Sequence, residues 1–164
     1  MDKPRAQTVH ATCVQIADCG VLIRGPSGSG KSDLALRLIT TEVAPLGRGL
    51  LCGDDQVQLE ADVGAGAGTV SARAVAALNG MLEVRGVGIV TVPTALRGTR
   101  TTLGLVVDLL AGVAEPERMP APAAVSLLGV PIPRLTLVAA RASSVAAVHA
   151  ALWQVRSQLR AADT

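Results

Sequence analysis

The chain has 164 residues, which is enough for one domain with a hydrophobic core and too few to favour two. Its 15 basic and 13 acidic residues nearly balance, and it has one Trp but no Phe or Tyr. Nucleic acid is therefore an unexpected partner, because its binding relies on basic surfaces and aromatic stacking platforms. The sequence shows neither an apolar run of transmembrane length nor the apolar core of a secretory signal. We expect a single domain over residues 1–164, cytoplasmic and without a membrane partner.

The first part of the chain predicts strands on either side of a helix. Residues 9–16 alternate loosely as a strand, residues 17–20 resemble a turn, and residues 21–23 form a short apolar strand ending at Gly25. The aliphatic residues between 34 and 39 then suit a helix packed on a sheet. A buried strand is predicted at residues 50–53, and Val57 and Leu59 continue with a period of two.

The remaining elements alternate in the same way. We predict a glycine-rich turn at 64–68, a short helix over 71–79 with Gly80 at its C-cap position, and strands over 82–92 and 103–110. A proline-containing loop at 115–122 precedes a last strand at 135–138, and an amphipathic helix follows Ser143 and Ser144. This pattern predicts an α/β fold, and the hairpin-like pairs favour a mixed sheet.

The glycine-rich loop carries the clearest chemical signal. Gly25-Pro26-Ser27-Gly28-Ser29-Gly30-Lys31-Ser32 matches the P-loop pattern G-x-x-x-x-G-K-[ST] between a predicted strand and a predicted helix. In such a loop, backbone N–H groups and the helix N-terminus face phosphate oxygens. We expect the Lys31 ammonium to reach the β/γ-phosphates and the Ser32 hydroxyl to bind Mg²⁺. The pattern predicts ATP and Mg²⁺ as ligands.

Several charged residues could supply the chemistry. Asp54 and Asp55 follow an apolar strand, as Walker-B acids do, so one could hold magnesium while the other takes a proton from an incoming hydroxyl. A polar turn is the alternative interpretation. His10 lies one strand upstream of the loop, where it could take part in the chemistry; the alternative interpretation is an ordinary strand residue. Glu83 and Arg85 share one strand face, which a solvated ion pair explains equally well.

Taken together, these residues resemble the catalytic domain of the HPr kinase/phosphorylase family. The resemblance rests on His10, the P-loop followed by Asp33, the Asp54–Asp55 pair and, above all, the segment LEVRGVGI at residues 82–89. It covers about residues 8–150. The resemblance implies a P-loop α/β domain with a mixed sheet and flanking helices, akin to phosphoenolpyruvate carboxykinase.

The resemblance also implies a reaction and its acid–base residues. The family transfers phosphate from ATP to a serine of the phosphocarrier protein HPr, which would be the partner here. His10 and Lys31 would be catalytic. Asp55 would deprotonate the acceptor serine and act as the acid in the reverse reaction, with support from Asp54.

Further roles follow from the resemblance for the metal and for the second reaction. Ser32 and Glu83 would bind magnesium. Arg85 lies in the segment that the family uses for both reactions, and Arg118 falls where the family places another active-site arginine. The family's late basic loop is reduced here to Arg141, so we expect kinase activity with only weak phosphorylase activity.

Two departures and two alternatives remain. The family's N-terminal domain is absent from this sequence, so we expect a short form like those of alphaproteobacteria, with self-association left open; residues 40–49 look like an insertion.

One alternative is a P-loop kinase of small molecules. The other is a nucleotide-binding regulatory module without catalysis, against which intact Lys31, Ser32, Asp54 and Asp55 argue.

Overall fold

The computed structural model describes residues 5–64, 68–112 and 115–162, apart from the side chains of three residues near the C-terminus. Over these residues it forms two α-helices, two single-turn 3₁₀ segments and eleven strands. The helices are α1 (Lys31–Thr40) and α2 (Ser144–Ala162). The strands are β1 (Arg5–His10), β2 (Thr12–Ile16), β3 (Cys19–Arg24), β4 (Gly49–Gly53), β5 (Gln56–Asp62), β6 (Thr69–Ala74), β7 (Met81–Val84), β8 (Gly88–Thr91), β9 (Arg100–Leu109), β10 (Ala123–Leu127) and β11 (Val130–Leu137).

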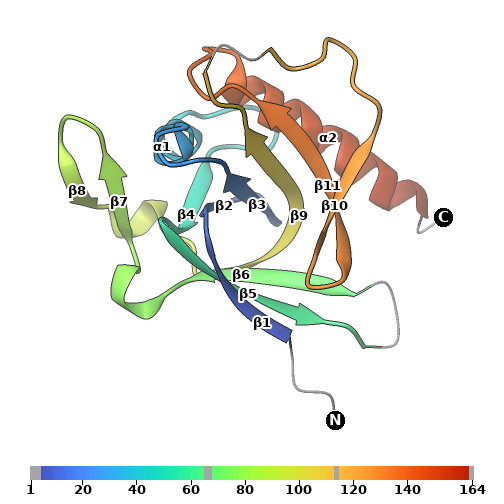
Figure 1. The fold of residues 1–164 in the computed structure, drawn as a ribbon, viewed down its shortest axis with the longest axis horizontal. Helices are drawn as coiled ribbons and strands as arrows, with labels where there is room; N and C mark the ends of the chain where they lie inside the picture. The colour runs from blue at the N-terminus through green and yellow to red at the C-terminus, as the bar shows by residue number, and fades with distance from the viewer. Residues whose placement is uncertain (1–4, 65–67, 113–114, 163–164) are drawn as a thin grey trace.

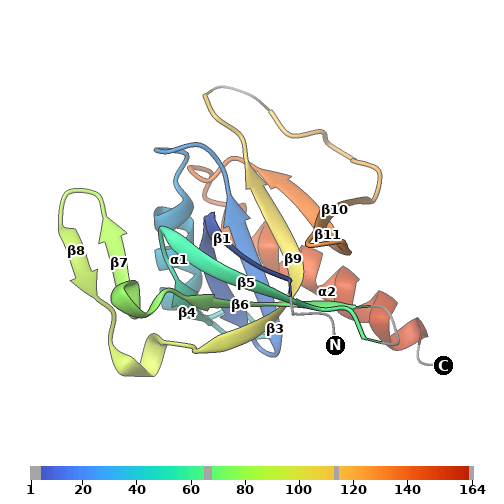
Figure 2. The same ribbon diagram turned by 60° about the horizontal axis from the view of Figure 1, so that its bottom comes forward.

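Nine strands form one curled, mixed sheet, as predicted. The main order is β1-β5-β6-β9-β3-β2-β4, and the β10–β11 hairpin joins through β11 to β9. β9 runs parallel to β3 and β11, whereas the other strand pairs of this sheet are antiparallel. Figure 1 shows β9 curving between the two halves of the sheet, with both helices beside the half that contains β3. In Figure 2, the separate β7–β8 hairpin projects away from the body.

Side-chain alternation on the central strands divides the buried residues between two cores. Val21 and Ile23 of β3 pack with residues of α1 and α2, whereas Leu22 faces Val57 and Leu59 of β5 in the second core. Because successive strand residues point to opposite faces, one strand serves both cores. The glycine-rich loop leaves β3 from between these two layers, so its base is fixed on both sides.

The helix predicted over residues 71–79 is wrong. Residues 69–74 form β6, which lies between β5 and β9, and only residues 76–78 make one 3₁₀ turn. Val70 and Ala72 are buried while Ser71 and Arg73 face outward, so burial follows a period of two. Pairing with two neighbouring strands overrides the helical preference of the alanines.

Other boundaries also differ from the predictions. The strand predicted over 9–16 divides at Ala11 into β1 and β2, which pair with different partners. The strand predicted over 82–92 is the β7–β8 hairpin, because Gly86 and Gly88 adopt positive φ angles of 83° and 109° at its turn. β10 was missed altogether. The predicted turn at 64–68 includes residues 65–67, which lie outside the described residues.

The predicted strand–loop–helix unit is confirmed, as are β4 and the terminal helix. β3 ends at Arg24 and α1 begins at Lys31, with residues 25–30 as the loop between them. On α2, Val145, Val148, Leu152 and Val155 are buried at helical spacing. Neither helix, over the residues described, is long and apolar enough to cross a membrane.

Candidate functional site

The glycine-rich loop adopts a conformation that needs its glycines. Gly28 and Gly30 have φ angles of 78° and 94°, and Gly30 is the N-cap residue of α1. Both angles are in the left-handed region, which side chains disfavour. A Cβ on Gly30 would also lie only 2.7 Å from the Cβ of Ala139. The loop therefore presents the N-terminus of α1, where unpaired N–H groups and the helix dipole favour an anion.

Lys31 lies folded against this loop. Its side chain is 7% exposed, and its Nζ donates hydrogen bonds to the carbonyl oxygens of Gly25 at 2.9 Å and Pro26 at 3.1 Å. The ammonium is therefore held within the loop that would surround a phosphate. Neutral carbonyls are weaker partners for an ammonium than a phosphate, so the same amine can turn to a bound anion.

Asp54 is a buried carboxylate that joins three elements. It is 5% exposed and accepts hydrogen bonds from Thr12 Oγ1 at 2.6 Å, Ser32 Oγ at 2.9 Å and the Glu83 backbone N–H at 3.1 Å. These donors belong to β2, α1 and β7. Multiple hydrogen bonds stabilise a carboxylate that is removed from water. Asp54 thus holds the end of β4, the start of α1 and the β7–β8 hairpin at one point.

Asp55 occupies the opposite environment, although it is the next residue. Its φ of 63° turns the chain outward, and its side chain is 61% exposed. Asp55 Oδ1 lies 3.2 Å from Nδ1 of His10, whose side chain is 55% exposed. The Ala11 N–H donates to the Asp55 carbonyl oxygen at 3.3 Å, which connects this turn to the end of β1. An accessible carboxylate with an adjacent imidazole is suited to proton transfer.

The β7–β8 hairpin brings further predicted residues to the loop. The Glu83 N–H binds Asp54, and the Glu83 and Arg85 side chains are exposed. The terminal nitrogen Nη2 of Arg85 lies 4.0 Å from the position that a Cβ on Gly28 would take. The segment 82–89, which carries most of the family resemblance, therefore lies alongside the glycine-rich loop. Arg85 itself lies beyond the end of β7, so its direction follows from the turn and not from strand alternation.

The two late arginines are placed differently. Arg118 is exposed in the loop between β9 and β10, without an ion pair or side-chain hydrogen bond to the described residues. Arg141 pairs with Glu115. Its carbonyl oxygen accepts a hydrogen bond from Arg37 at 3.2 Å, which connects this segment to α1. The contacts of these described residues do not bring Arg118 or Arg141 to Asp55.

Sequence reasoning missed a charged cluster under the loop. Arg24, the last residue of β3, binds Asp108 of β9 through two hydrogen bonds of 2.8 and 2.9 Å, and Arg134 of β11 donates to the same carboxylate at 2.6 Å. Burial alone would raise the pKa of Asp108, but the hydrogen bonds and charges of Arg24 and then Arg134 outweigh it and lower this pKa. Arg24 and Asp108 are 84 positions apart in the sequence. No local sequence pattern could therefore have indicated their contact.

Oxygen donors near Ser32 fit a small hard cation. The Ser32 hydroxyl and the Asp54 carboxylate are in contact, and Glu83 belongs to the strand whose backbone binds Asp54. A hydroxyl and a carboxylate are donors that suit Mg²⁺, which usually takes one or two carboxylates and completes its shell with waters and substrate phosphates.

The fold and this site define an α/β domain whose glycine-rich loop, lysine and buried acid are arranged around the N-terminus of α1. Residues 4–164 match the family model described as the HPr serine kinase C-terminal domain, so the chain belongs to this family.

Similar proteins agree with the family match. HPr kinase/phosphorylase proteins from Burkholderia lata and Burkholderia cenocepacia are each 37% identical over 170 residues, covering 98% of this chain and 49% of theirs. The chain thus spans about half the length of the curated relatives it matches. The structure of the HPr(Ser) kinase/phosphatase from Coxiella burnetii has the same fold, with a TM-score of 0.75 and 22% identity over 96% of this chain and 94% of that one.

Proposed function

We propose that this chain is an ATP- and Mg²⁺-dependent serine kinase that phosphorylates the phosphocarrier protein HPr. One observation carries the proposal: a buried acid bound to the P-loop serine lies next to an exposed acid bound to a histidine. The first arrangement suits a metal–phosphate site and the second suits a protein hydroxyl that arrives from solvent. Family membership supports HPr as the acceptor. With ATP as the donor, we place the reaction in the cytoplasm.

The loop residues would bind the phosphates of ATP. Backbone N–H groups of residues 25–30 and the N-terminus of α1 would hold the phosphate oxygens, while Lys31 would leave its loop carbonyls for the β/γ-phosphates. Ser32 and Glu83 would bind the metal, with Asp54 fixing the Ser32 hydroxyl. A bound Mg²⁺ would neutralise charge between the phosphates.

Asp55 would take the proton of the acceptor serine. Its exposure lets a loop of another protein reach it, and His10 holds its carboxylate from one side. Positioned base catalysis of this kind contributes about 10²–10⁴-fold to a rate. Arg85, beside the loop at Gly28, would stabilise the charge of the transferring group.

The reverse reaction, attack of inorganic phosphate on phosphoserine, would be weak. It brings two anions together and needs additional positive groups around them. Arg141, the arginine of the late loop, is paired with Glu115, so its charge is already partly neutralised. Arg118 would be the second candidate for this anion, since it is exposed in the neighbouring loop.

The test is a transfer reaction with labelled ATP, Mg²⁺ and HPr from the same organism, followed by location of the phosphate by mass spectrometry. We expect one phosphoserine on HPr, and no label on an HPr variant in which that serine is alanine. The Lys31→Ala variant serves as the enzyme control. Label that appears on a small molecule, or no transfer by a folded protein that binds ATP, would overturn the proposal.

A further inference from the structure

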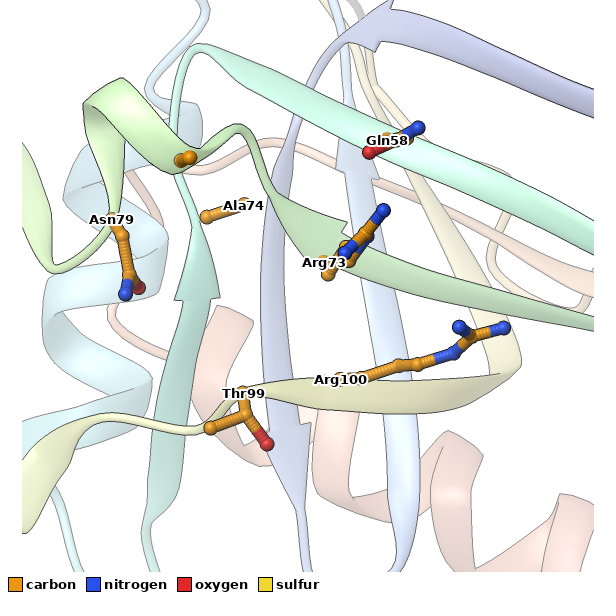
Figure 3. Close-up of a pocket in the computed structure, with 7 residues that line it drawn as sticks. Gln58, Arg73, Ala74, Asn79, Thr99 and Arg100 are labelled. Atoms are coloured by element: carbon orange, nitrogen blue, oxygen red, sulfur yellow. The ribbon is translucent and has the colours of Figure 1, made fainter.

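An open polar depression, which we call the outer cavity, lies on the outer face of the sheet, away from the glycine-rich loop. It has a volume of about 410 Å³, and its polar lining consists of Gln58, Arg73, Asn79, Thr99 and Arg100. Figure 3 shows these side chains on β5, β6, the segment after β6 and the start of β9. The depression is open to solvent, because Arg73, Asn79, Thr99 and Arg100 are exposed. None of these residues belongs to the site described above.

Strand register brings two like charges together in this cavity. Gln58 of β5 is paired with Arg73 of β6, and Arg73 is paired with Arg100 of β9. Directly paired residues on antiparallel strands point to the same face, with Cβ atoms about 5 Å apart. Two arginines in such a pair repel each other and destabilise the sheet. The register thus concentrates positive charge on this face of the sheet.

The protein neutralises only part of this charge. Arg100 Nη1 lies 2.7 Å from Glu60 Oε2, which occupies one side of that guanidinium. Arg73 makes no ion pair or side-chain hydrogen bond with any described residue, and no acidic side chain lines the cavity. The Arg73 guanidinium and the side-chain amides of Gln58 and Asn79 supply N–H donors. Two further lining residues, Ala74 and Ala76, have small side chains that leave space for an occupant. The lining thus resembles an oxyanion site.

We propose that this cavity binds a small dianion, either a phosphate group or a pair of carboxylates. Arg73 supplies a planar pair of N–H donors that matches both oxyanions, and Arg100 supplies the donors that Glu60 leaves unused. Bound anion relieves the Arg73–Arg100 repulsion. Ala74, which lines the cavity, packs closely on Gly53: a Cβ added to Gly53 would lie 3.1 Å from the Ala74 Cα. Gly53 is the last residue of β4, so an occupant would lie behind the strand that precedes Asp54 and Asp55. This proposal does not depend on the kinase assignment.

The experiment separates this cavity from the glycine-rich loop. The ¹⁵N-labelled Lys31→Ala protein, residues 1–164, whose loop site should be weakened, is titrated with inorganic phosphate and separately with malonate at constant ionic strength. We expect amide shifts that saturate around residues 58, 73, 79 and 99–100. Adding Arg73→Gln should weaken this binding at least tenfold, whereas Arg48→Gln, an exposed arginine in the loop after α1, should leave it unchanged.

Thermal unfolding gives an independent readout. In chloride alone, Arg73→Gln should be at least as stable as its parent because a like-charge pair is removed, and it should lose the stabilisation that the dianion gives its parent. Saturation by phosphate alone or by malonate alone supports the proposal and identifies the group. Shifts confined to residues 25–32, equal binding by the Arg73→Gln and Arg48→Gln proteins, or destabilisation by Arg73→Gln without any anion would overturn it.

Discussion

Asp54 and Asp55 are neighbours in sequence but differ in almost every physical respect. Asp54 is 5% exposed and accepts hydrogen bonds from three donor groups, whereas the side chain of Asp55 is 61% exposed and contacts one imidazole. The left-handed backbone of Asp55 separates them, because it turns the chain out of the sheet directly after the buried strand. Two carboxylates in such different environments can perform different tasks. We propose that Asp54 organises the site and that Asp55 performs the chemistry.

The largest effect on phosphate transfer is expected for Lys31, which lies in the glycine-rich loop but makes few structural contacts. Lys31→Ala should reduce phosphate transfer by about 10²–10³-fold, which is the typical cost of losing one preorganised electrostatic contact. The melting temperature should change little, because the lost partners are two loop carbonyls. Steady-state transfer at saturating ATP measures this, with Arg48→Ala as the control. Wild-type rates in Lys31→Ala would show that the loop does not hold the nucleotide.

Asp54 should differ from Lys31 by affecting stability as well as activity. Asp54→Ala leaves Thr12, Ser32 and the Glu83 N–H without their shared acceptor. Buried groups that lose their partner cost about 1–3 kcal/mol each, so we expect a loss of about 3 kcal/mol in the free energy of unfolding. Denaturant titration measures it. An unchanged unfolding midpoint would mean that the network around Asp54 adds nothing to the fold.

Thr12 allows a milder change to the same network. Thr12→Val keeps the shape of the side chain but removes the hydroxyl that donates to Asp54 at 2.6 Å. A hydrogen bond to a charged group is worth about 1.5 kcal/mol, which is the expected loss of stability. Because Ser32 and Glu83 still hold Asp54, transfer should fall by less than tenfold. If Thr12→Val equals Asp54→Ala in both measurements, Thr12 has a role beyond this hydrogen bond.

The two histidines also differ in burial, as the two acids do, but with a smaller expected effect. His10 is exposed beside Asp55, whereas His149 on α2 is fully buried and its ring nitrogens have no hydrogen-bond partner among the described residues. Burial lowers the pKa of His149. As the pH falls, His149 of the unfolded chain therefore takes up a proton before His149 of the folded protein does. The contribution of this residue to the free energy of unfolding is complete above about pH 6.5 and is lost as the pH falls through the lowered pKa.

His149→Leu should remove this contribution to the pH dependence. Its stability at pH 7 should equal or exceed that of the wild type by up to about 1 kcal/mol, because an unpaired buried polar group is replaced by an apolar one of similar size. Unfolding at pH values between 5 and 7.5 measures the difference, which should widen at lower pH. A difference that stays constant over this range would show that His149 does not titrate with folding.

Sequence patterns could predict the local part of the site. The P-loop pattern located residues 25–32, and the apolar strand before Asp54 and Asp55 placed both acids at the end of β4. The burial contrast between them was not predictable, since it depends on a backbone angle at Asp55. The partners Thr12 and Asp108 were missed because their contacts join strands that are distant in sequence.

Fold predictions failed where tertiary pairing outweighed local preference. The alanines after residue 71 suggested a helix, but β6 fills the gap between β5 and β9. β10 was overlooked because Pro131 and Pro133 argue against a strand in the segment that pairs with it. Both prolines belong to β11, and at residues 131 and 133 this strand pairs with β10 only, because its pairing with β9 begins at Arg134; the missing N–H groups are therefore tolerated.

The central claim is the division of labour between the two acids, and one matched measurement tests it. Asp55→Asn and Asp54→Asn are compared for Mg²⁺-dependent ATP binding and for single-turnover phosphate transfer to HPr. We expect Asp55→Asn to bind ATP within about threefold of the wild type and to transfer phosphate at least about 10²-fold more slowly, whereas Asp54→Asn should lose binding as well. An active Asp55→Asn beside an Asp54→Asn that binds ATP normally but transfers nothing would contradict the account.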